Sequence, residues 1–256
     1  MYFLDIKIDN LKKEEILQKV KSFLTSNKQY KIYTPNPEMI VDSTTDFYFK
    51  DILNKGNLNI CDGKGIQLFS KEKLNRFSGV DLMQEILKIA EQDMYSVYFL
   101  GSGDDKIIES LNSSVKKQYP NLKIAGSNKG LEINFLKIDD KNEIIFDKEK
   151  NNEIIGDIVM TAPDIIFVAF GHNKQEKWIN NFIVDIPSLK IAMGVGGSFE
   201  YLSGKIKRAP KWIRKIGLEW LYRFIKQPKR IKRILKATVI FSFLILKNKF
   251  NFKKYD

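Results

Sequence analysis

Several short polar segments carry residues that could bind an anion or move a proton, and each follows an apolar run typical of a β-strand. The segment TPNPE occupies residues 34–38. Pro37 at a first helical turn leaves neighbouring backbone amides free to meet an anion or a sugar hydroxyl. A structural interpretation is also open, in which Asn36 serves only as the helix N-cap.

A second segment, CDGKG at residues 61–65, places Asp62 at the end of another apolar run. A carboxylate there, followed by glycines that let a ligand approach the backbone, could be a general base or a hydroxyl ligand. An Asx-turn is the structural alternative. Arg76 follows within one short helix and could bind a phosphate bidentately, while Ser78 to Asp81 could cap the next helix.

A third segment is half of a dinucleotide fingerprint, formed by Gly101, Ser102 and Gly103. A lone G-x-G is a weak signal, because the full G-x-G-x-x-G is missing. It still predicts small residues and free backbone amides at a helix start, which suit a nucleotide phosphate.

Two further loops complete the set. In the segment 170–178, Gln175 offers both a donor and an acceptor to a uracil edge or a sugar hydroxyl, and Glu176 follows it. We expect His172 to be only a turn residue, because no partner carboxylate is near it in sequence. The last loop is rich in backbone donors and suits a phosphate or a sugar; its glycines are Gly194, Gly196 and Gly197.

The elements that must position these loops alternate between strand and helix patterns. Apolar runs of strand length are separated by amphipathic stretches. The expected strands are 30–33, 58–60, 95–100, 122–125, 165–170 and 189–193; the expected helices are 11–24, 37–54, 80–91, 104–119 and 173–183. This order predicts an α/β fold with a Rossmann-like, mostly parallel sheet and helices on both faces. Ligands bind beyond the carboxyl ends of such strands, where all five loops fall.

Charge divides the chain into two regions. Residues 205–256 hold 17 Lys and Arg against 2 Asp and Glu, whereas residues 1–204 hold 26 against 29. We therefore expect a catalytic body over 1–204 and a basic appendage over 205–256. So basic a segment requires an anionic partner, either nucleic acid or an acidic membrane surface.

The appendage is also amphipathic. The spacing predicts one helix over 212–225 and a break near Pro228, with apolar and basic residues on opposite sides. Residues 237–246 form a ten-residue, mostly apolar run. A bilayer span needs about 20 apolar residues, so this run suits an interfacial position.

Composition excludes several kinds of site. Cys61 is the single cysteine and His172 the single histidine, so neither an intramolecular disulfide nor a Cys- or His-based zinc motif can form. We expect a reducing, cytoplasmic setting and no signal peptide at the N-terminus. A D-x-D motif is missing from the strand-end loops, which argues mildly against metal-bridged chemistry.

In their order along the chain, these motifs resemble those of the WecG/TagA/CpsF family of bacterial glycosyltransferases. They are TPNPE (34–38), CDGKGI (61–66), RFSGVDLM (76–83), FGHNKQEKWI (170–179), GVGGSFEYLSGKIKRAPKW (194–212) and GLEWLYRFIKQPKR (217–230). The resemblance covers nearly the whole chain. It differs at Asn173, where the family often has Pro.

The resemblance implies an inverting, metal-independent enzyme without a cofactor. It would move N-acetylmannosamine or a similar sugar from a UDP-sugar to an undecaprenyl-diphosphate-linked sugar, at the cytoplasmic face of the plasma membrane. Asp62 corresponds to the family's proposed base. The other motif positions are Thr34, Asn36, Arg76 and Gln175. The tail arginines Arg214 and Arg223 are candidates to stabilise the leaving diphosphate.

Two other classes of function are open to the tail. A nucleic-acid-binding protein would explain the charge, but the tail's cations share helices with Trp212, Trp220 and Phe224, which suit lipid better than a duplex. A non-enzymatic lipid-surface scaffold would leave the five polar loops without a role. The sugar, the polysaccharide pathway (wall teichoic acid, capsule or another) and the oligomeric state, a homo-oligomer included, are left open.

Overall fold

The computed structural model describes the chain of 256 residues except 71, 139–140, 227, 229–230 and 253–256. Its central sheet has six parallel strands in the spatial order β4-β3-β10-β9-β5-β6. The strands are β3 (Tyr30–Tyr33), β4 (Leu58–Asn59), β5 (Ser96–Gly101), β6 (Lys123–Asn128), β9 (Ile165–Ala169) and β10 (Ile191–Gly194). Parallel neighbours need crossover connections, which the intervening helices supply. The predicted α/β fold is confirmed.

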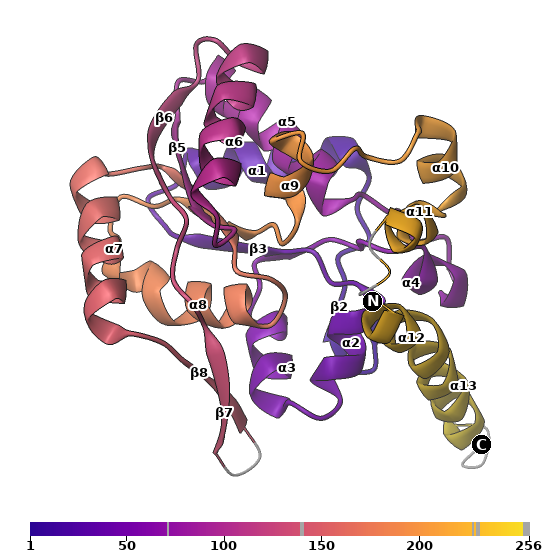
Figure 1. Ribbon diagram of the computed structural model, residues 1–256. Helices are drawn as coiled ribbons and strands as arrows, with labels where there is room; N and C mark the ends of the chain where they lie inside the picture. Colours follow the sequence, from indigo (N-terminus) through magenta and orange to yellow (C-terminus); the bar gives the residue numbers. More distant parts are fainter. Residues whose placement is uncertain (71, 139–140, 227, 229–230, 253–256) are drawn as a thin grey trace.

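Helices cover both faces of this sheet, as Figure 1 shows. One face carries α1 (Lys13–Leu24), α5 (Gly79–Gln92), α6 (Asp105–Gln118) and α9 (Ser198–Leu202). The other carries α2 (Pro37–Ser43), α3 (Phe47–Asn54), α7 (Lys148–Thr161), α8 (Lys174–Phe182) and the short η1 (Ile183–Asp185). Each face of the sheet packs against its helices in a separate hydrophobic core. Successive strand residues point to opposite faces, so Phe167 packs into one core and Val168 into the other.

Two helices predicted as continuous are each broken in the structure. The stretch 37–54 forms α2 and α3, because the Asp46 side chain accepts a hydrogen bond from the Phe49 amide and caps a new helix. The stretch 212–225 is divided between α10 (Lys211–Ile216) and α11 (Glu219–Lys226). Gly217 ends α10 with a φ of 85° in the left-handed region, a usual helix C-cap.

Two hairpins lie outside the main sheet. The strands β1 (Tyr2–Phe3) and β2 (Ile6–Lys7) pair near the N-terminus. The strands β7 (Asn134–Ile138) and β8 (Lys141–Ile145) form an antiparallel ribbon that extends beyond α3 in Figure 1. Alternation predicts neither hairpin, since the strands of both are short or largely exposed.

The C-terminal residues continue as α12 (Ile231–Leu235), the π-helical η3 (Lys236–Ile240) and α13 (Phe241–Phe252). A break was expected near Pro228; α11 is described to Lys226 and α12 from Ile231, and residues 227 and 229–230 lie outside the described residues. The apolar run packs on the body through one side only: Phe241 and Ile245 are buried in the core that includes α2, while Phe243 is 64% exposed. Across the described residues, the structure has no helix with the length and apolarity to cross a membrane.

Candidate active site

The motif loops form a row along the carboxyl edge of the sheet. From β4 towards β5 the row carries Asp62, then Thr34 and Asn36, then 194–197, Gln175 and finally 101–103. The helix after β3, α2, packs on one face, whereas α9 after β10 packs on the other. The loops after β3 and β10 therefore run to opposite faces of the sheet. Open α/β sheets bind ligands in the crevice that forms between two such loops.

The first two motifs meet directly. The Asp62 amide donates to the Pro35 carbonyl at 3.0 Å. A Cβ placed on Gly79 would lie 3.0 Å from Thr34 Oγ1 and 3.3 Å from Asp62 Oδ2, so both side chains border the start of α5. Asn36 caps α2 by accepting from the Met39 amide at 3.1 Å, as its structural interpretation predicted.

Asp62 is unusual in its electrostatics. Its Oδ2 accepts a hydrogen bond from the Gly79 amide at 3.1 Å. Burial raises the pKa of Asp62 to about 6, and the Glu219 carboxylate adds to the rise, while the Gly79 amide, Arg76 and Arg208 oppose it. A carboxylate with a pKa near 6 is largely ionised at neutral pH and accepts a proton more readily than an ordinary aspartate.

Arginines from both regions lie beside this carboxylate. Arg76 Nη2 donates to the Arg214 carbonyl at 3.3 Å, so the motif arginine contacts the backbone of α10. Arg214 Nη1 is 3.5 Å from Asp81 Oδ1, and its buried Nε has no partner among the described residues. A buried N–H without a partner is costly, which marks Arg214 as a donor that a bound anion would satisfy.

Gln175 and Glu176 join the row to the glycine loop after β10. Gln175 is buried; its Oε1 accepts from the Gly196 amide at 2.9 Å and its Nε2 donates to Glu176 Oε1 at 2.8 Å. Glu176 Oε2 accepts from the Asn173 amide and completes the cap of α8. A Cβ on Gly194 would lie 2.7 Å from Gln175 Nε2 and 3.0 Å from Glu176 Oε1, so a larger residue there would displace the Gln175 amide. Glu176 thus holds Gln175 in place.

The free amides expected at 101–103 are not present at two of the three positions. The Ser102 amide donates to the Ala169 carbonyl at 3.1 Å, and the Gly103 amide donates to the Lys129 carbonyl at 2.9 Å. The prediction was wrong here because the neighbouring strand β9 and the loop after β6 supply backbone acceptors that the local sequence does not show. The turn still lies in the row, with positive φ at Gly101, Ser102 and Gly103.

Arg223 covers the glycine loop. It lies against Gly197, where an added Cβ would come within 2.4 Å of the guanidinium. Arg223 Nη2 donates to Glu200 Oε2 at 2.7 Å, and the guanidinium stacks over the Tyr201 ring at 4.8 Å from its centroid. This contact brings α11 of the tail onto the loop after β10.

His172 lies in a turn, as expected, but the expectation that it is only a turn residue is wrong. Its Nε2 lies 2.8 Å from Asp42 Oδ2, and its Nδ1 lies 3.1 Å from Arg233 Nη2. Arg233 Nε also donates to Glu38 Oε1 at 2.9 Å. All these partners are distant in sequence, on α2 and α12, so a scan for neighbouring carboxylates could not find them.

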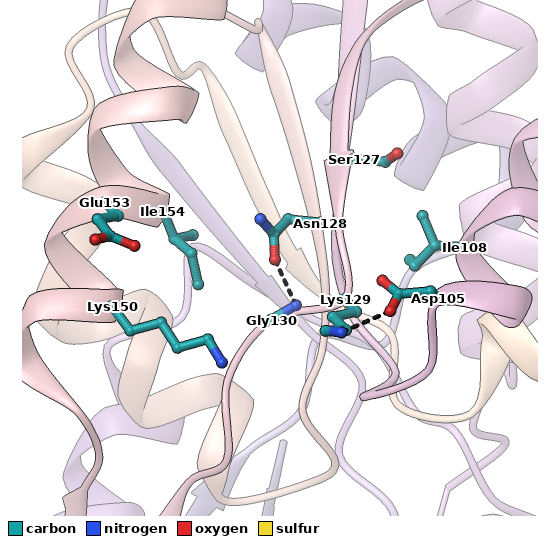
Figure 2. A pocket seen from close by; sticks show the side chains of 9 residues that line it. All are labelled: Asp105, Ile108, Ser127, Asn128, Lys129, Gly130, Lys150, Glu153 and Ile154. Atoms are coloured by element: carbon teal, nitrogen blue, oxygen red, sulfur yellow. Dashed lines mark hydrogen bonds and ion pairs between the residues drawn. The ribbon is translucent and has the colours of Figure 1, made fainter.

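A cavity of about 290 Å³ lies at the far end of the row, between α6, the end of β6 and α7, as Figure 2 shows. Its Lys129 is paired with Asp105 at 2.6 Å. Five strand spacings separate β6 from β4, so the cavity lies roughly 24 Å along the sheet from the loop of Asp62. The cavity is thus separate from the cluster around Asp62.

Sequence reasoning missed two residues of the Asp62 surroundings, Arg208 and Glu219. They form an ion pair of 3.0 Å between the segment after α9 and the start of α11. Both lie inside the motif segments 194–212 and 217–230, and Glu219 is one of the two acidic residues in the basic tail, but neither signal indicates that they meet. Within the described residues, no group of three His, Cys, Asp or Glu side chains is arranged to hold a metal ion.

Comparison with known proteins identifies the family. Residues 1–255 match the model of the glycosyl transferase WecG/TagA/CpsF family. A protein of Bacillus subtilis (strain 168) is 31% identical over 252 residues, covering 97% of this chain and 88% of its own length. A protein of Staphylococcus aureus (strain MW2) is 31% identical over 257 residues, covering 98% and 94%. Both are named N-acetylglucosaminyldiphosphoundecaprenol N-acetyl-beta-D-mannosaminyltransferase.

The match extends over the same stretch of chain as the ordered motifs. In the structure, the motif residues of this match lie on loops at the ends of the strands of one parallel sheet. The chain therefore belongs to the WecG/TagA/CpsF family and is a glycosyltransferase.

Proposed function

We propose that this enzyme transfers N-acetylmannosamine from a UDP-sugar to N-acetylglucosamine linked to undecaprenyl diphosphate, with inversion at the anomeric carbon. The names of the two relatives, which align over nearly their full lengths, support this choice of substrates. The observation that carries the mechanism is Asp62, a carboxylate with a pKa of about 6 in the row of strand-end loops, on which the charges of Arg76 and Arg208 act.

Asp62 is the general base in this proposal. It takes the proton of the acceptor hydroxyl as that oxygen forms a bond to the anomeric carbon of the donor sugar. The bond between the anomeric carbon and the UDP oxygen breaks at the same time, and UDP leaves with the electron pair from the opposite face. One carboxylate is sufficient for such a single displacement. Thr34 and Asn36, in the adjoining loop, orient the reacting sugars.

The leaving diphosphate needs positive charge, and arginines can supply it without a divalent metal. Arg214 has a buried N–H that lacks a partner among the described residues, and Arg76 lies beside it. Arg223 reaches the same edge through the Gly197 loop. Chelation by EDTA should therefore leave the transfer rate unchanged.

The donor lies along the row of loops, with its nucleotide towards β9 and β5 and its sugar towards Asp62. At Gly103 and Gly196 an added Cβ would meet nothing within 4 Å, so a ligand can approach the backbone of both loops.

Residues 205–256 form an appendage that docks the body, 1–204, on an anionic membrane at the cytoplasmic face. The acceptor diphosphate lies at the plane of the lipid headgroups, so the active site must be brought there. Large apolar side chains on the tail remain exposed beside its basic residues; among them are Trp212, Trp220, Ile225, Phe243 and Leu246. Each basic residue near an anionic surface contributes about 1 kcal/mol.

A donor screen tests the proposal. The full chain is incubated with a short-chain lipid-diphosphate-GlcNAc acceptor and each of a set of UDP-sugars, and the product and its anomeric configuration are determined. We expect the fastest turnover with UDP-N-acetylmannosamine and a β-linked product. Preference for another UDP-sugar would assign the enzyme to a different polysaccharide, and turnover with none would contradict the proposal.

A further inference from the structure

Arg208, between α9 and α10, uses all three nitrogens of its guanidinium in hydrogen bonds within the protein. Nη1 and Nη2 donate to the two oxygens of Asp81 at 2.6 and 3.0 Å, and Nη2 also donates to Ser78 Oγ at 3.0 Å. Nε donates to Glu219 Oε1 at 3.0 Å. The side chain is 17% exposed. A bidentate, charge-assisted arrangement of this kind fixes both distance and orientation.

These contacts connect the tail to the first turn of α5. Ser78 is the N-cap of α5, and Asp81 stands in its first turn. Gly79, between them in sequence, donates its amide to Asp62 Oδ2. Arg208 thus holds the helix turn whose backbone donor contacts the proposed base. Glu219, in the first turn of α11, holds Arg208 from the tail side.

The charged groups around Asp62 come from four elements. The loop before α5 gives Arg76, which favours the ionised carboxylate; the segment 205–210 gives Arg208, which acts in the same direction; and α11 gives Glu219, which acts against it. Two other ionisable groups are near Asp62 in sequence: burial raises the pKa of the Cys61 thiol to about 12, so it stays neutral, and Lys64 of α4 (Lys64–Phe69) donates to Gln67 Oε1 at 2.9 Å.

We propose that Arg208 and Glu219 are positioning residues that make the proton-accepting power of Asp62 depend on the docking of residues 205–226. When the tail is docked, Arg208 stabilises the carboxylate and holds the Gly79 amide against it, while Glu219 limits that effect. The proposal rests on the proposed role of Asp62 as the general base. As a consequence, Asp62 has the proton affinity suited to transfer only when the tail is docked over the site.

The test is the pH dependence of kcat/KM for the full chain, measured from about pH 5 to pH 9 with UDP-N-acetylmannosamine and the short-chain acceptor. Arg208→Met should move the midpoint of the acidic limb upward by about 0.5 unit or more, because a stabilising cation is lost. Glu219→Gln should move it downward by a similar amount, about 0.5 unit, because a destabilising anion is lost. Arg208→Lys, which keeps the charge, should leave the midpoint within about 0.2 unit of the parent while lowering the rate.

Opposite shifts distinguish this role from a merely structural one, since a loosened fold would affect both variants alike. Midpoints that stay unchanged in both variants, or that move in the same direction, would overturn the proposal. Should Arg208→Met fail to fold, the comparison of Glu219→Gln with the parent still decides the proposal, because a midpoint that does not move downward would overturn it. Asp62→Asn is the reference: if it transfers normally, the assigned base is wrong, whereas if it is inactive and the midpoints do not move, only the present inference fails.

Discussion

The Lys177–Asp46 ion pair, called the body pair below, and the two ion pairs that hold α12 and η3 against α2, called the tail pairs below, differ in how much water reaches them. In the body, Lys177 is paired with Asp46 at 2.7 Å, with side chains 0% and 2% exposed. In the tail, Arg233 pairs with Glu38 and is 44% exposed, and Lys236 pairs with Asp42 and is 36% exposed. The first pair is screened neither by solvent nor by salt, whereas the second set is open to both.

Because of this difference, we expect the buried pair to stabilise the fold of the body and the exposed pairs to affect only how firmly the tail is held. The Lys177 ammonium is surrounded by the Asp46 carboxylate, the Asn142 carbonyl and the Phe135 ring, so it is part of the packing between α3, α8 and the β7–β8 ribbon. Exposed pairs typically contribute about 0.2–1 kcal/mol each. We therefore expect loss of the body pair to lower the stability of the fold strongly, and loss of a tail pair to weaken only the docking of the tail.

The largest expected effect is on the body pair. Asp46→Ala leaves the Lys177 charge buried without its carboxylate and removes the cap of α3, so we expect the free energy of unfolding to fall by about 3–5 kcal/mol. Urea denaturation at neutral pH measures it. Asp5→Asn is the matched control, since Asp5 pairs with Lys50 while 84% exposed, and Asn tolerates the left-handed φ of 64° at this position; stability should change by less than about 1 kcal/mol. Equal losses in the two variants would contradict the comparison.

The second prediction concerns the site that the tail covers. Asp62→Asn should lower the transfer rate by about 10² or more, because it removes the base, and should leave UDP binding intact. In the parent enzyme, transfer should fall as the pH drops through about 6, where Asp62 becomes protonated. Rates measured across pH for both proteins check this, and near-normal turnover of the variant would refute the assignment.

The raised pKa of Asp62 also predicts how the stability of the fold changes with pH. Its pKa in the fold lies above the usual aspartate value, so ionised Asp62 opposes folding above about pH 6 and this opposition fades as the pH falls towards 4. Asp62→Asn should therefore melt at the same temperature as the parent or higher near pH 8, with the gap closing in acid. A lower melting temperature near pH 8 would show that the carboxylate supports the fold.

Two phenylalanines on α13 sharpen the comparison within the tail. Phe241 is 1% exposed and packs edge-on against Phe69, whereas Phe243 is 64% exposed. Phe241→Ser should lower stability by about 3 kcal/mol through a cavity. Phe243→Ser should keep stability and weaken binding to phosphatidylglycerol-containing vesicles several-fold. Sedimentation with such vesicles measures binding, and an unaltered affinity of Phe243→Ser would remove α13 from the docking surface.

The smallest effect belongs to the tail pairs themselves. Arg233→Ala should weaken tail docking by about 0.2–1 kcal/mol, because His172 and Lys236 remain to face the carboxylates of α2. Limited proteolysis within the tail, at low and high salt, reports the docked fraction. We expect cleavage to speed up modestly in the variant and with salt, while the body resists. Cleavage that is insensitive to salt would indicate that apolar packing alone holds the tail.

Local patterns were sufficient for much of the molecule. The alternation of apolar strands with amphipathic helices predicts the parallel sheet and the loops at its carboxyl edge, because each strand and helix must bury its own apolar face. Caps such as Asn36 and Ser78 are also visible in sequence, since each bonds to a backbone amide three residues ahead. The excess of basic residues after position 204 is a property of composition alone.

Contacts between distant residues were decided only by the tertiary structure. His172 meets Asp42 across 130 residues, and Arg208 meets Asp81 across 127. The amides of Ser102 and Gly103 are taken by carbonyls of β9 and of the loop after β6. Periodicity reports which face of an element is buried, but it does not report which polar groups the packing of other elements will bring against that face. The proton affinity of Asp62 depends on such neighbours, because burial and nearby charges set it.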